Sequence, residues 1–422
     1  MDLYGELEWR GLIYDATEGV RDLLAREKVT TYAGFDPTAS SLHVGHILPI
    51  LALARLQRFG HPPIAVVGGG TGLIGDPSFK ASERALLTAE QVEANVAAIR
   101  AQLARFLDFA GTAAPARLVN NAEWLTKLGA IEFMRDVGKH FTVNAMMAKE
   151  SVKRRVESEE GISYTEFSYP LLQSYDFLVL FDRYHCTLQI GGSDQWGNIT
   201  AGMDLIRRVR GRKAHGLVLP LLMTAAGTKF GKTEAGSVWL DPSLTRPYEF
   251  YQFWLNTDDR DVVTYLKFFT FLDRPRITEL EAAAARAPEQ REAQRELARE
   301  VTRLVHGDEA VRQAEAAAAM LFSEDVTAMT LQQIRERLAN VPTLTIPPRA
   351  EGWSAVDLLA ESGVTKSKSQ ATQLIRGGGI YINDRRVTNE KERVTPDQAI
   401  EGQVFVVRKG KKDNYLVNIA RG

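Results

Sequence analysis

Residues 29–49, VTTYAGFDPTASSLHVGHILP, lead from an apolar run into two histidines that are three positions apart. The first seven residues are typical of a buried strand, and residues 47–60 have the apolar spacing of a helix that ends at Gly60. The order repeats, with a second apolar run at 63–70 and an amphipathic helix expected within 87–109. Strands that alternate with helices predict an α/β protein with a parallel sheet covered by helices.

The composition is that of a globular protein with two or three domains. The chain has 422 residues, of which 45% are hydrophobic and 25% charged, and its formal net charge is −1. Any surface for nucleic acid must therefore be local. The single cysteine, Cys186, excludes an internal disulfide and a multi-cysteine zinc site, and it fits a reducing compartment. We find no signal peptide and no apolar run of the roughly 18 residues that a membrane helix needs, so we expect a cytoplasmic protein without a membrane partner.

Changes of composition divide the chain into parts. Residues 1–247 hold the alternation of strands and helices, whereas residues 248–323 are rich in Ala, Glu and Arg and predict a helical domain. Within that domain, Thr278 followed by Glu281 has the spacing of a capping box, which predicts that a helix begins after Thr278. The proline-containing stretch 324–350 predicts a linker, and the remainder has the length of a small domain.

Three interpretations of the HVGH pair are open at this point. His43 and His46 have the spacing of two metal ligands on one helical turn, although no third ligand lies at a recognised spacing. They also fit two structural histidines. The third interpretation is a phosphate site, because Gly45 lets a ligand approach closely and the following helix offers free N–H groups to an anion.

A second element favours the phosphate interpretation. Residues 228–233, TKFGKT, place Lys229 and Lys232 around a glycine in a loop of small and polar residues. The loop lacks the order of a P-loop and also fits a plain exposed basic segment. Two ammonium groups on a mobile loop are, however, suited to charge that appears only in a transition state. The histidine pair and the lysine pair together are more specific than either alone.

These elements resemble the signatures of the class I aminoacyl-tRNA synthetases. HVGH is similar to their HIGH motif and KFGKT to their KMSKS loop, and over its whole length the chain resembles the tyrosyl-tRNA synthetases of bacteria. The resemblance implies a Rossmann-like catalytic domain with an insertion at about 105–175, an α-helical domain and a small α+β domain. The stretches that carry it are YAGFDPTASSLHVGH (32–46), GDPSFKASER (75–84), FSYPLLQSYDF (167–177), QIGGSDQWGN (189–198) and TKFGKTEAG (228–236).

The resemblance implies a two-step reaction. The carboxylate of L-tyrosine attacks the α-phosphate of ATP to give tyrosyl-adenylate and pyrophosphate, and the tyrosyl group then passes to the 3′ end of tRNA(Tyr). The nucleophile is already charged, so catalysis must come from positioning and from donors to the phosphates. ATP is then a substrate accompanied by Mg²⁺, with no bound organic cofactor and no zinc. The residues implied at the phosphates are His43, His46, Thr38, Lys80, Arg84, Lys229, Lys232 and Thr233.

The resemblance also implies the two binding pockets. Tyr32 and Asp176 would meet the phenolic hydroxyl of tyrosine, and phenylalanine would leave both unpaired. Tyr169, Gln173 and Asp176 have the spacing of one helix face. The implied tyrosine contacts are Tyr32, Asp76, Tyr169, Gln173, Asp176, Gln189 and Gln195, and the implied ATP contacts are Gly34, Asp36, Gly45, Gly192, Asp194 and Lys232.

Basic stretches are the candidates for tRNA. Residues 351–422 carry 12 Lys and Arg against 9 Asp and Glu, a net charge of +3, and resemble a small RNA-binding domain of a ribosomal protein. The family also implies a homodimer, for which we expect the apolar stretch 129–147 to form the interface. The expected tRNA contacts are Lys149, Lys153, Arg154 and Arg155, then Arg207, Arg208, Arg210, Arg212 and Lys213, and in the last domain Lys366, Lys368, Arg376, Arg385 and Arg386.

Three other functions compete with this interpretation. Tryptophanyl-tRNA synthetases share both signatures, but Asp176 with Tyr32 and the C-terminal domain favour tyrosine. A non-catalytic RNA-binding protein would be expected to have lost a signature histidine or lysine, and none is lost. A nucleotidyltransferase with an HxGH turn would need neither TKFGKT nor an RNA-binding domain.

Overall fold

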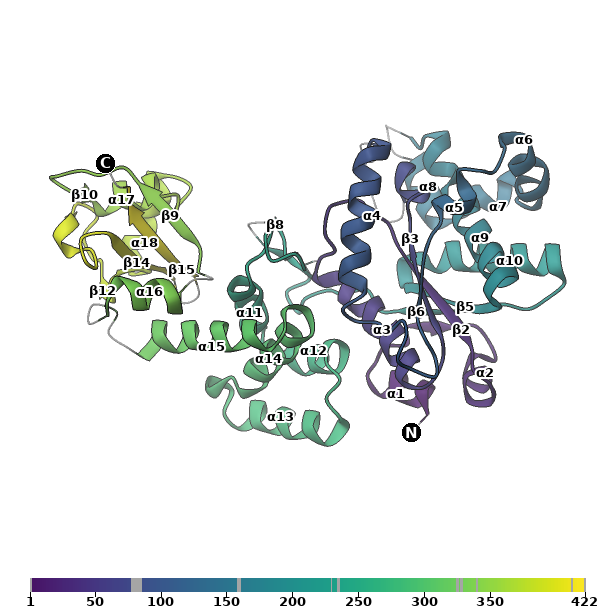
Figure 1. The fold of residues 1–422 in the computed structure, drawn as a ribbon, viewed down its shortest axis with the longest axis horizontal. Coiled ribbons are helices and arrows are strands. Elements are labelled where there is room, and N and C mark those ends of the chain that lie inside the picture. The colour runs from purple at the N-terminus through teal and green to yellow at the C-terminus, as the bar shows by residue number, and fades with distance from the viewer. Residues whose placement is uncertain are drawn as a thin grey trace. The chain divides into compact units, whose positions relative to one another are not determined.

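A computed structural model describes residues 2–76, 86–157, 161–228, 230–233, 236–323, 326, 329–338, 341–410 and 413–420. The chain forms two compact units, which are described separately below (Figure 1). Unit 1 comprises Met1–Asp241 and Arg260–Glu279, and unit 2 comprises Pro242–Asp259 and Leu280–Gly422.

A six-stranded sheet with the order β1-β6-β5-β2-β3-β4 forms the centre of unit 1. Strands β2 to β6 are parallel to one another, and the edge strand β1 pairs antiparallel with β6, so the predicted parallel sheet is confirmed. The strands are β1 (Asp15–Ala16), β2 (Thr30–Phe35), β3 (Pro63–Val67), β4 (Arg117–Asn120), β5 (Cys186–Gly192) and β6 (His215–Leu219).

The strand order reverses beside β2. From β2 the chain continues to β3 and β4 on one side and then returns to β5 on the other side. Open α/β sheets bind ligands at the carboxyl ends of the strands where such a reversal occurs. Tyr32 of β2 lies opposite Gln189 of β5 in the register, so the reversal brings two candidate pocket residues together.

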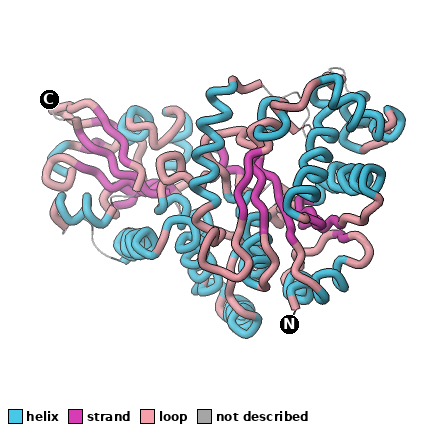
Figure 2. Tube along the Cα trace, turned by 45° about the vertical axis from the view of Figure 1, so that its right-hand side comes forward, coloured by secondary structure: helices cyan, strands magenta, loops and turns pink. Residues whose placement is uncertain are grey.

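Helices cover both faces of this sheet (Figure 2). Helix α3 packs on β2, β3 and β5, whereas α10 packs on β5, β6 and α9. Helix α3 begins directly after His46 and ends before Gly60, which has a φ of +83°, as predicted. The helices are α1 (Leu3–Trp9), α2 (Val20–Arg26), α3 (Ile47–Arg58), α4 (Ala89–Leu103), α5 (Ala122–Leu125), α6 (Ala130–Glu132), α7 (Val143–Met147), α8 (Glu150–Val156), α9 (Tyr164–Tyr184), α10 (Trp196–Arg210) and α12 (Val262–Phe269).

Helix α9 confirms that Tyr169, Gln173 and Asp176 share one helix face. The Ser163 hydroxyl accepts a hydrogen bond from the Glu166 N–H and so caps its start. The helix is 21 residues long; its Tyr169 donates to Asp36, just after β2, and its Gln173 accepts from Asn198, which follows β5.

The predicted start of a helix after Thr278 is wrong. Helix α13 (Arg274–Arg286) begins five residues earlier, and the Asp273 carboxylate accepts a hydrogen bond from the Arg276 N–H. Thr278 lies inside the helix, where its hydroxyl donates to the Arg274 carbonyl. Aspartate is the stronger cap, and a threonine inside a helix bonds back to the preceding turn instead.

Unit 2 contains a group of helices and a small α+β domain. Its second sheet has the order β12-β11-β14-β15-β9, and Trp353, Leu358, Ile380 and Phe405 are among its core residues. The helices are α11 (Pro247–Leu255), α14 (Glu292–His306), α15 (Asp308–Ser323), α16 (Leu331–Arg337), α17 (Ala355–Glu361) and α18 (Lys368–Arg376). The strands are β9 (Thr343–Ile346), β10 (Trp353–Ser354), β11 (Ile380–Ile382), β12 (Arg385–Arg386), β13 (Arg393–Val394), β14 (Val404–Lys409) and β15 (Asp413–Ile419).

The stretch 324–350, predicted as a linker, contains regular structure. It includes α16 and β9, and β9 pairs in parallel with Leu416–Ile419 of β15. Prolines 342 and 347 flank this edge strand rather than interrupt it, so the proline content did not exclude a strand. The small domain therefore takes part of its sheet from residues before 351. In the described part of the chain, no helix is both long and apolar enough to cross a membrane.

Candidate active site

The HVGH turn lies between β2 and α3 and fixes both histidine rings. The His43 N–H donates to Nδ1 of His46 at 3.1 Å, and the Gly45 N–H donates to Nδ1 of His43 at 3.1 Å. The ring centroids are 4.0 Å apart. Because both Nδ1 atoms accept hydrogen bonds, the neutral rings carry their proton on Nε2. Each ring can therefore donate from Nε2, which suits phosphate oxygens.

Glycine is required between these histidines. A Cβ on Gly45 would lie 2.9 Å from Cε1 of His43, which is closer than Cβ atoms lie to other side chains in real structures. A larger residue would displace the imidazole ring of His43, so Gly45 affects the site through the position of that ring. Gly34 and Thr38, also predicted at the nucleotide, are both exposed nearby at the end of β2 and just after it.

Asp176 is one of the predicted tyrosine contacts; it lies at the buried end of the expected pocket and is only 4% exposed. Its carboxylate accepts hydrogen bonds from Asn121 Nδ2 at 2.9 Å and Trp124 Nε1 at 2.7 Å. Burial nevertheless raises the pKa of Asp176 to about 7. Sequence reasoning missed Asn121 and Trp124, although Asn120 ends β4 and Asn121 directly follows it, at the carboxyl ends of the strands where ligands bind.

Two polar atoms beside Asp176 have no partner among the described residues. They are the Tyr32 hydroxyl and Oε1 of Gln189, and both side chains are buried. Burial, and then the charge of Asp176, raise the pKa of Tyr32, so its hydroxyl stays protonated. Buried polar atoms are almost always hydrogen-bonded, so this end of the pocket is prepared for a polar ligand group.

Two carboxylates lie farther along the same pocket. Asp36 accepts from the Tyr169 hydroxyl at 2.8 Å and from the Thr71 hydroxyl at 2.7 Å. Sequence reasoning placed Asp36 at the nucleotide, and these bonds join its carboxylate to Tyr169, which is a predicted tyrosine contact. Asp76 accepts from Gln195 Nε2 at 2.8 Å. An ammonium group is a suitable partner for these carboxylates.

An amide network connects the remaining pocket residues. Asn198 Nδ2 donates to Gln173 Oε1 at 3.1 Å and to Gln195 Oε1 at 3.2 Å. Next to this network, a Cβ on Gly192 would lie 2.3 Å from Oδ1 of Asp194, so a side chain there would displace that carboxylate. The stretch QIGGSDQWGN thus brings amides and a carboxylate to the carboxyl end of β5.

The KFGKT loop lies against the HVGH turn. The Val44 N–H donates to the Val238 carbonyl at 2.9 Å, and the Val238 N–H donates to the Gly231 carbonyl at 3.1 Å. Strand β7 (Lys232–Thr233) pairs with β8 (Gly236–Ser237). Several predicted phosphate contacts lie outside the described residues, namely Lys80, Arg84, Lys229 and the side chains of Lys232 and Thr233.

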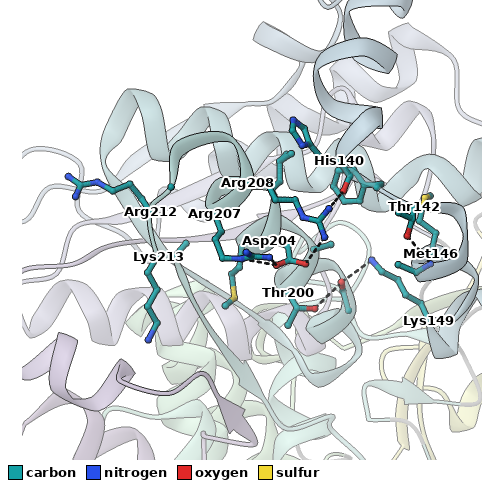
Figure 3. Close-up of a pocket in the computed structure, with 18 residues that line it drawn as sticks. His140, Thr142, Met146, Lys149, Thr200, Asp204, Arg207, Arg208, Arg212 and Lys213 are labelled. Atoms are coloured by element: carbon teal, nitrogen blue, oxygen red, sulfur yellow. Dashed lines mark hydrogen bonds and ion pairs between the residues drawn. The ribbon is translucent and has the colours of Figure 1, made fainter.

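A basic cavity of about 680 Å³ opens between α7 and α10 (Figure 3). Lys149 Nζ donates to the Gly197 carbonyl at 3.0 Å, and burial lowers the pKa of Lys149 to about 8. Arg207 and Arg208 both form ion pairs with Asp204. The cavity is lined by Lys149, Arg207, Arg208, Arg212 and Lys213, with His140, Thr142 and Met146 among its other residues.

The remaining predicted tRNA contacts differ in their environment. The surface role of Arg155 is wrong, because Arg155 is buried and paired with Glu166 at 2.9 Å. The side chain of Arg154 lies outside the described residues. In the C-terminal domain Lys366 is exposed, and three exposed cations form ion pairs with carboxylates: Lys368 with Asp357, Arg376 with Glu390 and Arg385 with Glu392.

Comparisons with known proteins decide the family. A profile described as tRNA synthetases class I (W and Y) matches residues 24–323, and one described as a tyrosine–tRNA ligase SYY-like C-terminal domain matches residues 333–417. The tyrosine–tRNA ligase of Roseiflexus castenholzii is 56% identical over 417 residues, which are 98% of each chain. That of Geobacillus stearothermophilus is 53% identical over 425 residues, with 100% of each chain covered. The chain belongs to the bacterial tyrosine–tRNA ligases.

Solved structures agree with this family. A C-terminally truncated mitochondrial tyrosyl-tRNA synthetase from Aspergillus nidulans matches with a TM-score of 0.69 and 34% identity, covering 76% of this chain and 94% of that one. A tryptophanyl-tRNA synthetase from Encephalitozoon cuniculi matches with a TM-score of 0.53 at 14% identity, covering 74% and 89%, which shows a shared fold alone. The resemblance read from the sequence is confirmed, and this ligase family member is a class I aminoacyl-tRNA synthetase.

Proposed function

We propose that this chain activates L-tyrosine with ATP and transfers it to tRNA(Tyr). The observation that carries the proposal is the buried end of the pocket, where Asp176 lies beside the unpartnered hydroxyl of Tyr32. A phenol placed there donates to the Asp176 carboxylate and accepts from Tyr32. Phenylalanine offers neither group, so it leaves both buried polar side chains unpaired.

The carboxylates farther along the pocket orient the rest of the substrate. Asp76 and Asp36 attract the ammonium group, and Gln173 offers an amide oxygen to one of its protons. This places the carboxylate of tyrosine near the HVGH turn, where it can attack the α-phosphate of ATP. Attack forms the carboxyl–phosphate bond of tyrosyl-adenylate and breaks the bond to pyrophosphate.

Donors around the phosphates stabilise the charge that develops in this step. The Nε2 atoms of His43 and His46 donate to phosphate oxygens, and Gly192 with Asp194 suits the ribose. The sequence adds Lys80, Arg84, Lys229, Lys232, Thr233 and Thr38 to the same task. Imidazole N–H donors suit phosphate rather than a hard cation, so Mg²⁺ would be carried by the ATP itself.

Exchange of pyrophosphate into ATP tests this proposal directly. The full-length chain is incubated with each of the twenty amino acids in turn. We expect exchange with tyrosine alone. Exchange with tryptophan would contradict the role of Asp176, and the absence of exchange from folded protein would contradict the activity.

The basic cavity and the C-terminal domain support tRNA as the second substrate. Arg207 and Arg208 are exposed at the rim of the cavity, and Lys149 lies inside it. Replacing both arginines with alanine is expected to raise the KM for tRNA and to weaken its dependence on salt, while exchange with tyrosine stays unchanged. An unchanged KM for tRNA would remove this cavity from the tRNA surface. Because tRNA is the substrate and Cys186 is the single cysteine, we place the enzyme in the cytoplasm.

An apolar surface supports a homodimer. Ile131 is 74% exposed, Met134 51%, Val143 63% and Tyr164 76%, and all four lie between β4 and the start of α9. Large apolar side chains exposed in one segment of the chain are the residues that an interface would cover. Ile131→Lys is expected to shift the sedimentation of the chain toward the monomer, whereas a dimer unchanged by it would place the interface elsewhere.

A further inference from the structure

Two arginines close the carboxyl end of α12. Nη1 of Arg10 donates to the carbonyls of Lys267 at 2.9 Å and Thr270 at 3.2 Å. Nη2 of Arg55 donates to the carbonyls of Phe268 at 2.9 Å and Thr270 at 2.7 Å. The last carbonyls of a helix have no partner within the helix and form the negative end of its dipole. Both guanidinium groups therefore hold α12 at this end.

The two arginines come from parts of the chain that are remote from α12. Arg10 directly follows α1, and Arg55 belongs to α3, the helix that begins just after the HVGH turn. They are 3% and 2% exposed, respectively. Helices α3 and α12 are in contact (Figure 1). The helix that directly follows the HVGH turn thus holds α12 in place through Arg55, which lies in its third turn.

Arg10 also forms an ion pair with Glu6 at 2.5 Å, whereas the burial of Arg55 is unfavourable for stability alone. Burial, and then the charge of Arg10, lower the pKa of Arg55 well below its usual range. Nε and Nη1 of Arg55 have no hydrogen-bond partner among the described residues. Incompletely paired buried charges destabilise a fold, and apolar side chains of similar size often replace them without loss. A requirement for one defined position of α12 explains the two arginines better.

The face of α12 carries an aromatic platform for the KFGKT loop. Phe230, between Lys229 and Lys232, stacks on Phe269 with ring centroids 5.3 Å apart and meets the edge of Tyr265 at 5.0 Å. All three aromatic side chains are buried. Aromatic contacts of this kind have a defined geometry, so the position of α12 determines where Phe230 lies.

The base of the loop also touches the HVGH turn. Gly231 has a φ of +79°, and a Cβ there would lie 2.7 Å from a methyl group of Val44. The loop therefore has two fixed neighbours, the HVGH turn on one side and α12 on the other. Helix α3 relates them to each other, since it begins at the turn and its Arg55 holds α12.

We propose that Arg10 and Arg55 are positioning residues for adenylate formation. They hold α12 as the platform on which Phe230 anchors the KFGKT loop, so that its lysines reach the phosphates bound at the HVGH turn. This inference rests on the proposed function, because it concerns the first step of that reaction. It assigns a catalytic consequence to residues that touch neither tyrosine nor ATP.

A double-mutant cycle tests the proposal in the full-length chain. Arg10→Met and Phe230→Ala are each expected to slow adenylate formation in a single turnover by about 10- to 100-fold, the range expected when reacting groups are displaced by about 1 Å. Equilibrium binding of tyrosine should change less than about twofold, because its pocket is separate. The double variant should lose about as much as the worse single variant, because both act through one contact.

Two further variants serve as controls. Phe230→Met keeps an apolar contact with Tyr265 and Phe269 and should restore most of the rate lost by Phe230→Ala. Arg58→Met changes an exposed arginine of α3 that lies over the ring of Phe271, and it should react at the normal rate. Arg58 is matched to Arg55 in residue type and helix.

Each other outcome overturns the proposal. A normal rate in Arg10→Met and in Phe230→Ala would show that the platform does not position the loop. If both single variants lose tyrosine binding, Arg10 and Phe230 have a structural role. If the rate losses of the two single variants multiply in the double variant, the two residues act independently. If the unmodified chain gives no exchange with tyrosine, the proposed function fails and this inference fails with it, whereas normal exchange by the unmodified chain confines the failure to the platform.

Discussion

At the scale of single residues, Asp176 shows how burial and hydrogen bonding oppose each other. Asn121 and Trp124 donate to its carboxylate and favour the charged form, yet burial raises its pKa to about 7. An ordinary aspartate titrates near 4, so between about pH 4 and 7 the folded chain binds more protons here than the unfolded chain. This group therefore makes the free energy of unfolding decrease as the pH rises through that window.

Tyrosine binding should follow the same titration. Three donors, namely Asn121, Trp124 and the phenol, need both oxygens of an ionised Asp176. We expect the Kd for tyrosine to fall by roughly tenfold between pH 6 and 8, because the ionised fraction rises by that factor. Calorimetric titration across this range measures it. Asp176→Asn should bind tyrosine more weakly, and its Kd should not change with pH. If its Kd changes with pH as steeply as that of the unmodified chain, another group is responsible for the titration.

The glycine between the histidines gives a second prediction at this scale. Gly45→Ala should slow adenylate formation by about 10- to 100-fold, because its methyl group displaces the His43 ring. Gly377→Ala is a suitable control, since a Cβ there lies at ordinary contact distances of 3.4 Å and 3.7 Å in the C-terminal domain. Single-turnover kinetics with tyrosine compare the two. Equal rates would show that the HVGH turn tolerates a side chain.

Some residue roles could be predicted because a local sequence pattern indicates them, and others could not because no such pattern exists. The HVGH spacing of His43 and Gly45 is local, as is the helix spacing of Asp176, so both patterns could be seen in the sequence, whereas the roles of these residues were implied by the family resemblance. The bonds from Asn121 and Trp124 to Asp176 join positions 55 and 52 residues apart, and no short pattern records them. Arg155 was misjudged because a charge run does not reveal that one member turns inward to Glu166.

At the scale of elements, helix interiors were easier to predict than helix starts. The apolar spacing of α3 and the polar face of α9 follow directly from the periodicity of the sequence. The start of α13 could not be predicted in the same way, because Thr278 matched a capping box while Asp273 provides the cap. Several residues near a helix start can act as caps, and their final choice depends on the packing of the whole helix.

The corrected cap is open to measurement. Asp273→Ala removes the acceptor for the Arg276 N–H and should lower the free energy of unfolding by about 1 kcal/mol. Thr278→Ala, inside the same helix, should change it by less than about 0.5 kcal/mol, because alanine is the better helix former. Urea denaturation followed by circular dichroism compares the variants. Equal losses would restore Thr278 as the cap.

At the scale of the whole molecule, composition indicated where the parts change but not where the last one begins. The prolines suggested a linker up to residue 350, yet β9 belongs to the sheet of the C-terminal domain. Pairing between β9 and β15 joins segments about 70 residues apart. Sequence patterns describe neighbours along the chain, so they could not assign this strand to its partner.

The corrected boundary decides how a truncation should be made. A chain ending at residue 323 should keep exchange with tyrosine within about twofold and lose tRNA charging by about 100-fold, since it removes the basic domain. A chain ending at residue 350 keeps β9 without β15, and its unpaired strand should make it aggregate more readily. Aminoacylation assays and light scattering measure both. Normal charging by the shorter chain would assign the domain another role.

The parallel pairing of β9 with β15 also has a consequence for synthesis on the ribosome. Chains grow at about 5–20 residues per second, so β9 waits roughly 4 to 14 seconds before β15 has been made. The residues of unit 1 end at Glu279, so all of them have been synthesised before β9. A nascent chain is therefore expected to complete the sheet of unit 1 first and the sheet of the C-terminal domain only after β15 has left the exit tunnel.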